Sequence, residues 1–256
     1  MFTQAIVRPP AANFADGLTT AGLGKPNLAT ALAQHARYCS ALESCGLTLT
    51  RLPPNEEFPD ATFIEDTAIL TARCAILTHP GAPSRAGEVA GIAEVLRRFY
   101  TNVHSIAAPG TVDGGDVCDC DGYFLIGISA RTNAEGARQL AEFLAREGFT
   151  SATIDIRGVR GILHLKSGIS YLGDWRVAVI DTLAGHPALR DYASVLVTPQ
   201  ENYAANCLRI NDHIIVAAGH PQFEAAVRES GHPVIALDMS EFRKMDGALT
   251  CLSLRF

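Results

Sequence analysis

Hydrophobic and polar positions follow a recurring order along this chain. A segment that carries polar residues comes first, a short apolar run follows, and a pattern of apolar residues at helical spacing comes last. The first clear example has residues 61–67, the apolar run 75–78, and one helical face with Ile92, Val95, Leu96 and Phe99. From this pattern we predict a strand, a second strand and a helix.

The same order recurs in three further units, at residues 113–148, 164–195 and 206–227. The helix of the second unit ends at Gly148, because glycine is the usual residue after a helix terminus. A weaker helix is expected at 189–195 in the third unit. A strand around Cys251, together with the amino-terminal strand 5–7, would complete a fifth unit.

Chemically reactive residues lie at the start of each unit, among them an acid pair, an Asp-Gly-Gly-Asp turn, a histidine and the near-terminal Cys251. An ordinary α/β domain is the simpler interpretation of alternating strands and helices. That interpretation does not account for reactive residues at the same place in every unit. Five units closed around an axis would bring these reactive residues together at one end of the ring.

Composition narrows the class of protein. The chain has 256 residues, of which 48% are hydrophobic and 19% charged, and we expect residues 1–256 to form one globular α/β domain. No apolar run is long enough for a membrane helix, and the amino end lacks the pattern of a signal peptide, so we expect no membrane partner. A net charge of −6 and the absence of basic runs argue against nucleic-acid binding.

Cysteine usage indicates the compartment. Seven cysteines without a disulfide-framework spacing favour reduced thiols and a cytoplasmic location. Cys118 and Cys120 are too close together, and have too few partners, for an ordinary zinc site. We therefore expect no metal ligands from the sequence.

Taken together, five segments identify a family. They are Phe63-Ile64-Glu65-Asp66, Asp113-Gly114-Gly115-Asp116, Arg131-Thr132-Asn133, His164-Leu165-Lys166 and Gly247-Ala248-Leu249-Thr250-Cys251. In this order the set resembles the dimethylarginine dimethylaminohydrolase family of the guanidine-modifying superfamily, over nearly the whole chain. The resemblance implies a five-bladed α/β propeller, the pentein fold, with ββαβ repeats around a central substrate channel. It also implies hydrolysis of N-methylated arginine to citrulline and a methylamine without a cofactor.

Three residues are candidates for catalysis. A guanidinium is a poor electrophile, and a thiolate is the strongest side-chain nucleophile near neutral pH, so Cys251 is expected to attack the guanidinium carbon. A covalent S-alkylthiouronium intermediate would result. His164 would protonate the leaving amine and then deprotonate the attacking water. The resemblance implies that Asp113 orients His164 and favours its protonated form.

The remaining candidates would bind substrate. Two adjacent carboxylates in an apolar strand favour a cationic partner, so we expect Asp66 to contact the guanidinium and Glu65 to support it. The neighbouring Phe63 is also expected at the substrate. The resemblance further implies a set of contacts to the other end of the substrate: Arg85 and Arg131 on its carboxylate, Asp60 on its ammonium group, and Leu18 in a lid.

Some alternatives stay open on the sequence. In relatives that deiminate arginine, an aspartate lies two residues after the histidine, whereas Lys166 has that position here. This difference favours a methylated substrate, with arginine or another guanidine as the alternative. Propellers of this architecture that bind ribosomal subunits offer a non-catalytic hypothesis, which the Cys/His/acid set disfavours. A small-molecule substrate is the expected partner, and association into a homodimer is left open.

Overall fold

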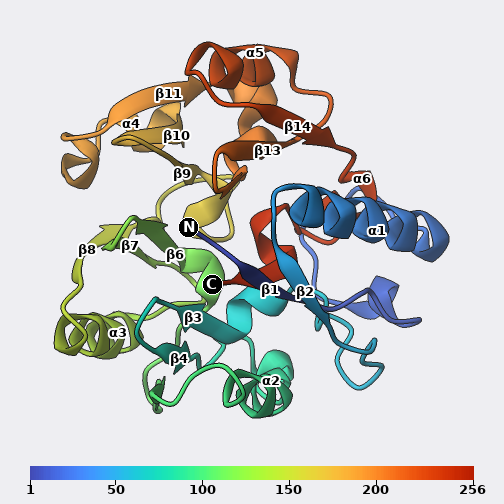
Figure 1. The fold of residues 1–256 in the computed structure, drawn as a ribbon, viewed down its shortest axis with the longest axis vertical. Helices are drawn as coiled ribbons and strands as arrows, with labels where there is room; N and C mark the ends of the chain where they lie inside the picture. Colours follow the sequence, from blue (N-terminus) through green and yellow to red (C-terminus); the bar gives the residue numbers. More distant parts are fainter.

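Five three-stranded sheets surround a central axis (Figure 1) in a computed structural model that describes residues 1–256. In every sheet the middle strand pairs antiparallel with one neighbour and parallel with the other. The sheets are β3–β4–β5 (Ala68–Leu70, Ala75–Leu77, Val103–Ser105), β6–β7–β8 (Val117–Cys120, Tyr123–Ile128, Thr150–Asp155), β9–β10–β11 (Ile169–Gly173, Arg176–Ile180, Ala193–Val197), β12–β13–β14 (Leu208–Ile210, His213–Ala217, Val234–Leu237) and β15–β1–β2 (Ser253–Arg255, Gln4–Val7, Thr48–Arg51).

One helix connects the two parallel strands of each blade, as a parallel pair requires. These helices lie at the outside of the ring in Figure 1 and are α1 (Leu28–Ser44), α2 (Glu88–Leu96), α3 (Ala134–Arg146), α4 (Asp181–Ala184) and α5 (Pro221–Glu229). A short extra helix, α6 (Ser240–Arg243), precedes the last blade's inner strand. The five-bladed α/β propeller with ββαβ repeats is confirmed.

Ring closure depends on the two ends of the chain. β15 pairs antiparallel with β1, in a register that places Ile6 opposite Leu254. Both termini consequently lie near the centre of the ring (Figure 1). The predicted fifth unit is therefore confirmed, although Cys251 precedes β15 instead of lying in it.

The reactive residues lie in turns, which corrects the strand predicted at 61–67. Each blade's inner strand is preceded by a short 3₁₀ helix, and we call these five segments the inner turns: Ile64–Thr67, Gly114–Asp116, Leu165–Ser167, Pro199–Ala205 and Thr250–Leu252. Local side-chain bonds favour the turn, since the Thr67 hydroxyl donates to the carbonyl of Ile64 at 2.7 Å. Strand alternation therefore does not decide where Glu65 and Asp66 point.

Two other local predictions were wrong. Residues 189–195 contain the start of β11 and no α-helix, because Gly185 and Pro187 end α4 and redirect the chain. Phe99 lies beyond the end of α2, where its ring packs against Phe256 with centroids 5.0 Å apart.

Neighbouring blades share their hydrophobic cores. One buried cluster joins Ile76 of β4 to Phe124 of β7 and Leu140 of α3, and another joins Ile6 of β1 to Ile92 of α2. Close packing between blades fixes their relative positions, and with them the positions of the inner turns. None of the helices combines the length and apolar character that crossing a membrane requires.

Candidate functional site

Hydrogen bonds between the inner turns connect one blade to the next. The amide of Gly115 donates to Asp66 Oδ1 at 2.8 Å, and the amide of Leu165 donates to Asp116 Oδ1 at 2.9 Å. On the other side of the axis, the Thr250 hydroxyl donates to Glu65 Oε2 at 2.8 Å. These bonds are made by buried groups, so they hold the reactive side chains in a fixed mutual arrangement.

A cavity of about 160 Å³ opens where the inner turns meet. The predicted site residues that line it are Leu18, Asp60, Phe63, Asp66, Arg85, Arg131, His164 and Cys251. Glu65 and Asp113 are the two predicted residues that do not. The structure thus brings together side chains separated by more than two hundred positions in the sequence.

His164 and Asp113 form a buried pair at the cavity wall. His164 Nε2 lies 3.0 Å from Asp113 Oδ2, behind the face that lines the cavity. Burial alone would lower the pKa of His164, but the charges of Asp66, Asp116 and Asp113 outweigh it and raise the pKa to about 9. His164 is therefore protonated near neutral pH and able to donate a proton. Burial likewise opposes ionisation of Asp113, but the bond to His164 dominates and lowers its pKa.

Cys251 is a neutral thiol in the unliganded protein. Burial, reinforced by the nearby charges of Glu65 and Asp66, raises the pKa of Cys251 to about 12. A cation placed in the cavity would offset those carboxylates and favour the thiolate.

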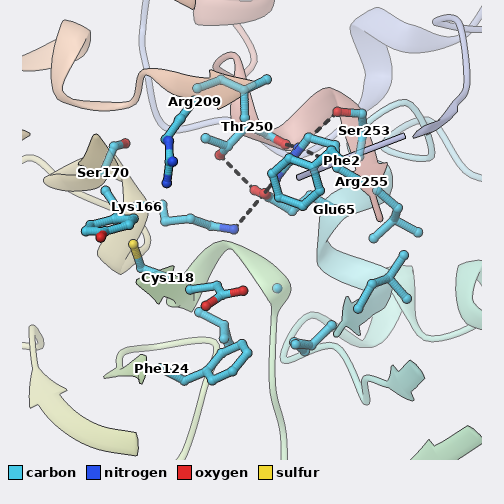
Figure 2. A pocket seen from close by; sticks show the side chains of 18 of the residues that line it. Phe2, Glu65, Cys118, Phe124, Lys166, Ser170, Arg209, Thr250, Ser253 and Arg255 are labelled. Carbon is cyan, nitrogen blue, oxygen red and sulfur yellow. Dashed lines mark hydrogen bonds and ion pairs between the residues drawn. The ribbon is translucent and has the colours of Figure 1, made fainter. Parts of the chain in front are cut away.

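Glu65 lines a different cavity, which it shares with Lys166, Thr250 and Arg255 (Figure 2). Its Oε1 atom lies 2.6 Å from Lys166 Nζ and 2.8 Å from the Arg255 guanidinium, while Oε2 accepts from Thr250. All its close partners belong to the protein. Because Thr250 adjoins Cys251 in sequence, this network holds the backbone next to the thiol in place.

Two arginines line the cavity, and they differ in how many protein groups their guanidinium groups bind. Arg85 is buried, and its guanidinium binds Asp66 at 2.5 Å, both oxygens of Glu88 and the carbonyl of Phe63. Burial opposes ionisation of Arg85, but Asp66 and Glu88 outweigh it and hold its pKa well above the usual range. Arg131 has only a long contact, 3.9 Å, to Asp113. Its planar fork is therefore available to a ligand.

The predicted lid is tied to the cavity rim. The Leu18 amide donates to both oxygens of Asp60, at 3.1 and 3.2 Å, and burial raises the pKa of Asp60. Two residues later, the Thr20 amide donates to Asp246 at 2.5 Å. The side chain of Leu18 remains exposed, as a residue at the cavity mouth would be.

Some functional residues were missed from the sequence. Glu88 anchors Arg85 from three positions along the chain, a spacing typical of helical ion pairs that could have indicated it. Asp116 lies in the Asp-Gly-Gly-Asp motif, where it accepts from Ser129 and from the turn that carries His164. No local pattern points to Asp246, which reaches the cavity from a loop.

At the wall of the cavity lies a set of atoms that could hold a metal, since Asp66, Asp113 and His164 each offer one within 4.8 Å of the others. Those side chains already bind each other or other protein groups: Asp66 bonds to Arg85 and Gly115, and Asp113 bonds to His164. The arrangement is accounted for by hydrogen bonds between protein groups.

Gly115 permits the close approach of two inner turns. A Cβ atom there would lie 2.6 Å from His164 Nδ1 and 3.0 Å from Asp66 Oδ1. We expect Gly115→Ala to displace the imidazole and lower kcat roughly a hundredfold, the cost of a displacement near one ångström. Steady-state kinetics with a melting curve measures this. Gly158→Ala, where a Cβ meets nothing within 4 Å, is the matched control. Unchanged kcat in Gly115→Ala would show that the position of His164 is not critical.

Known proteins resemble this chain in sequence over nearly its whole length. No protein-family model matches the chain. It is 44% identical over 257 residues to an N(G),N(G)-dimethylarginine dimethylaminohydrolase of Pseudomonas aeruginosa, covering all of both chains. A protein of the same name from Streptomyces coelicolor is 34% identical over 98% of this chain and 96% of its own.

Solved structures show the same relationship. The Pseudomonas aeruginosa enzyme, as a cysteine-to-serine variant complexed with citrulline, superposes with a TM-score of 0.97 at 43% identity over the whole of both chains. The N-terminal domain of a cyanobacterial arginine dihydrolase has a TM-score of 0.89 at 17% identity, over 98% of this chain and 97% of its own. At that identity the second likeness concerns the fold alone.

Proposed function

This chain belongs to the dimethylarginine dimethylaminohydrolase family, and we propose that residues 1–256 act as one domain that hydrolyses N-methylated L-arginine to L-citrulline and a methylamine. The observation that carries this proposal is the shared cavity. Cys251, His164 and Asp66 line it together with the available guanidinium of Arg131.

Charge in the cavity matches a cationic amino acid. Asp66 and its neighbours give the inner end an excess of carboxylates, where a substrate guanidinium is stabilised. Arg131, supported by Arg85, holds the substrate carboxylate, and Asp60 receives the ammonium group. Leu18 and Phe63 cover the aliphatic part and limit access of water.

The first half of the reaction forms a covalent bond. The substrate cation lowers the pKa of Cys251, and its thiol proton leaves to solvent. The Cys251 thiolate attacks the guanidinium carbon and forms a tetrahedral adduct. His164, protonated before binding and aligned by Asp113, donates a proton to the departing methylated nitrogen. The carbon–nitrogen bond breaks, leaving an S-alkylthiouronium on Cys251.

The second half releases citrulline. His164 is now neutral and accepts a proton from water, which attacks the thiouronium carbon. The carbon–sulfur bond then breaks, and Cys251 is regenerated. The balance is one substrate cation and one water converted to citrulline and a methylammonium ion.

Selectivity for a methylated nitrogen follows from what surrounds the thiol. A cavity of about 530 Å³ adjoins the smaller one and shares Cys251 and His164 with it, giving room for methyl groups. Lys166 also lines the larger cavity. Its ammonium group is paired with Glu65, and a lysine supplies no carboxylate to bind the substrate guanidinium. A nitrogen that carries methyl groups needs fewer hydrogen-bond acceptors than the unmodified nitrogen of arginine.

A substrate panel tests the proposal. We expect kcat/KM for dimethyl- and monomethylarginine to exceed that for arginine by at least about tenfold, measured as citrulline formed. The Cys251→Ser variant sets the background rate. A preference for arginine would replace the proposed substrate with the alternative guanidine, and no citrulline from any of the three would refute the proposal.

A further inference from the structure

Away from the catalytic cavity, Cys74, His104 and Glu147 come together between the first two blades. A ligand atom of each, the thiol sulfur, a ring nitrogen and a carboxylate oxygen, lies within 4.8 Å of the other two. None of the three lines the cavity that contains Cys251, and the mechanism uses none of them.

Sheet geometry places the first two residues on one face. Cys74 directly precedes β4, and His104 of β5 lies opposite Ile76 in the parallel register. Because side chains two positions apart share a face, Cys74, Ile76 and His104 point the same way. That face packs against α3 of the next blade, whose end supplies Glu147 as the C-terminal cap.

Neighbouring groups hold the side chains in place. Asn102 Nδ2 donates to Glu147 Oε1 at 2.6 Å, and His104 Nε2 lies 3.3 Å from the same oxygen. The His104 ring stacks on Phe143, with centroids 4.7 Å apart and planes inclined by 15°. Side chains of His104 and Glu147 are 22% and 19% exposed, so an ion in solution can reach them.

We propose that Cys74, His104 and Glu147 bind a zinc ion that bridges the first two blades. Thiolate, imidazole and carboxylate are the three donor types that zinc prefers, whereas calcium and magnesium take oxygen ligands. Ligand atoms around tetrahedral zinc lie roughly 3.5 Å apart, so contraction by about 1 Å completes the site. Water takes the fourth position, and the proton displaced from Cys74 passes to solvent.

Cobalt binding to the full-length protein provides the test. Cys251 and His164 could themselves hold a thiophilic ion, so every measurement uses the Cys251→Ser background. Titration with Co²⁺ is expected to give the thiolate-to-cobalt charge-transfer band and the d–d bands of a tetrahedral ion, saturating at one equivalent. Zinc should displace the cobalt and abolish the spectrum.

Variants assign the signal to this cluster. Adding Cys74→Ser should remove the charge-transfer band and weaken binding more than about a hundredfold, while Asn102→Ala, which frees Glu147, should weaken it roughly tenfold. Cys45→Ser, at another buried thiol, is the matched control and should change nothing. A band that survives Cys74→Ser, or no cobalt uptake, would overturn the proposal and leave a hydrogen-bonded His104–Glu147 pair beside a buried thiol.

Discussion

Replacing Cys251 with serine is expected to abolish citrulline formation, lowering kcat by about 10⁴-fold or more. A serine hydroxyl stays protonated in a cavity where burial, together with nearby carboxylates, already raises the pKa of the thiol to about 12. It is also a much weaker nucleophile toward a guanidinium carbon. Citrulline release from dimethylarginine, followed over long incubations, measures the residual rate.

A binding measurement distinguishes loss of the chemical step from loss of the folded structure. Asp66, Arg131 and Asp60 remain in place in Cys251→Ser, so dimethylarginine should still bind, with an affinity within about tenfold of the parent KM by calorimetry. Cys39→Ser, at a buried thiol of α1, should keep full activity. Retention of more than a few per cent of activity in Cys251→Ser would refute covalent catalysis by this residue.

The order of strands and helices along the chain was predictable, because it depends on the local pattern of hydrophobic and polar residues. Apolar runs such as 213–217 and the helix through Phe223 and Val227 lie where the hydrophobic pattern predicts them. The pairing of the chain ends was also predictable, since five repeats around an axis require a closing strand. The local pattern gave wrong predictions at two places. Pro187 redirects the chain before residues 189–195, and Phe99 lies beyond the end of α2.

The directions in which side chains of the inner turns point were not predictable from the alternation of side chains along a strand. Glu65 and Asp66 are adjacent and equally buried, yet one binds Lys166 and Arg255 while the other binds Arg85. Lys166 and Arg255 come from other blades, Arg85 comes from the connection between β4 and β5 of the same blade, and these partners determine which way each carboxylate points. Long-range ion pairs of this kind have no signature in sequence spacing.

Convergence of three acids explains how one histidine can act first as an acid. Asp66, Asp116 and Asp113 come from the first two blades and surround His164 of the third. Their combined charge overcomes the cost of burying an imidazolium, which burial alone would disfavour. Asp66 also acts on Cys251, where burial and the charges of Glu65 and Asp66 raise the pKa of the thiol, so one carboxylate influences the charge state of both His164 and Cys251.

Removing one of those charges should slow the reaction severely. Asp113→Asn is expected to lower kcat by about 10³-fold, because the amide preserves shape but not the charge that stabilises the imidazolium. Asp191→Asn, an exposed acid beside Arg190, is the matched control and should leave kcat unchanged. Melting curves of both variants verify that the fold is intact.

The pH profile distinguishes a catalytic effect of Asp113 from a merely structural one. Only protonated His164 can donate to the leaving amine, so activity falls as pH rises through its pKa, which is about 9 in the free protein. Asp113 helps raise that pKa, and the asparagine variant should therefore lose activity at lower pH than the parent. A lower kcat with an unmoved alkaline limb would mean that Asp113 positions the ring without controlling its charge. A shifted limb ties the acid–base step to the His164–Asp113 pair.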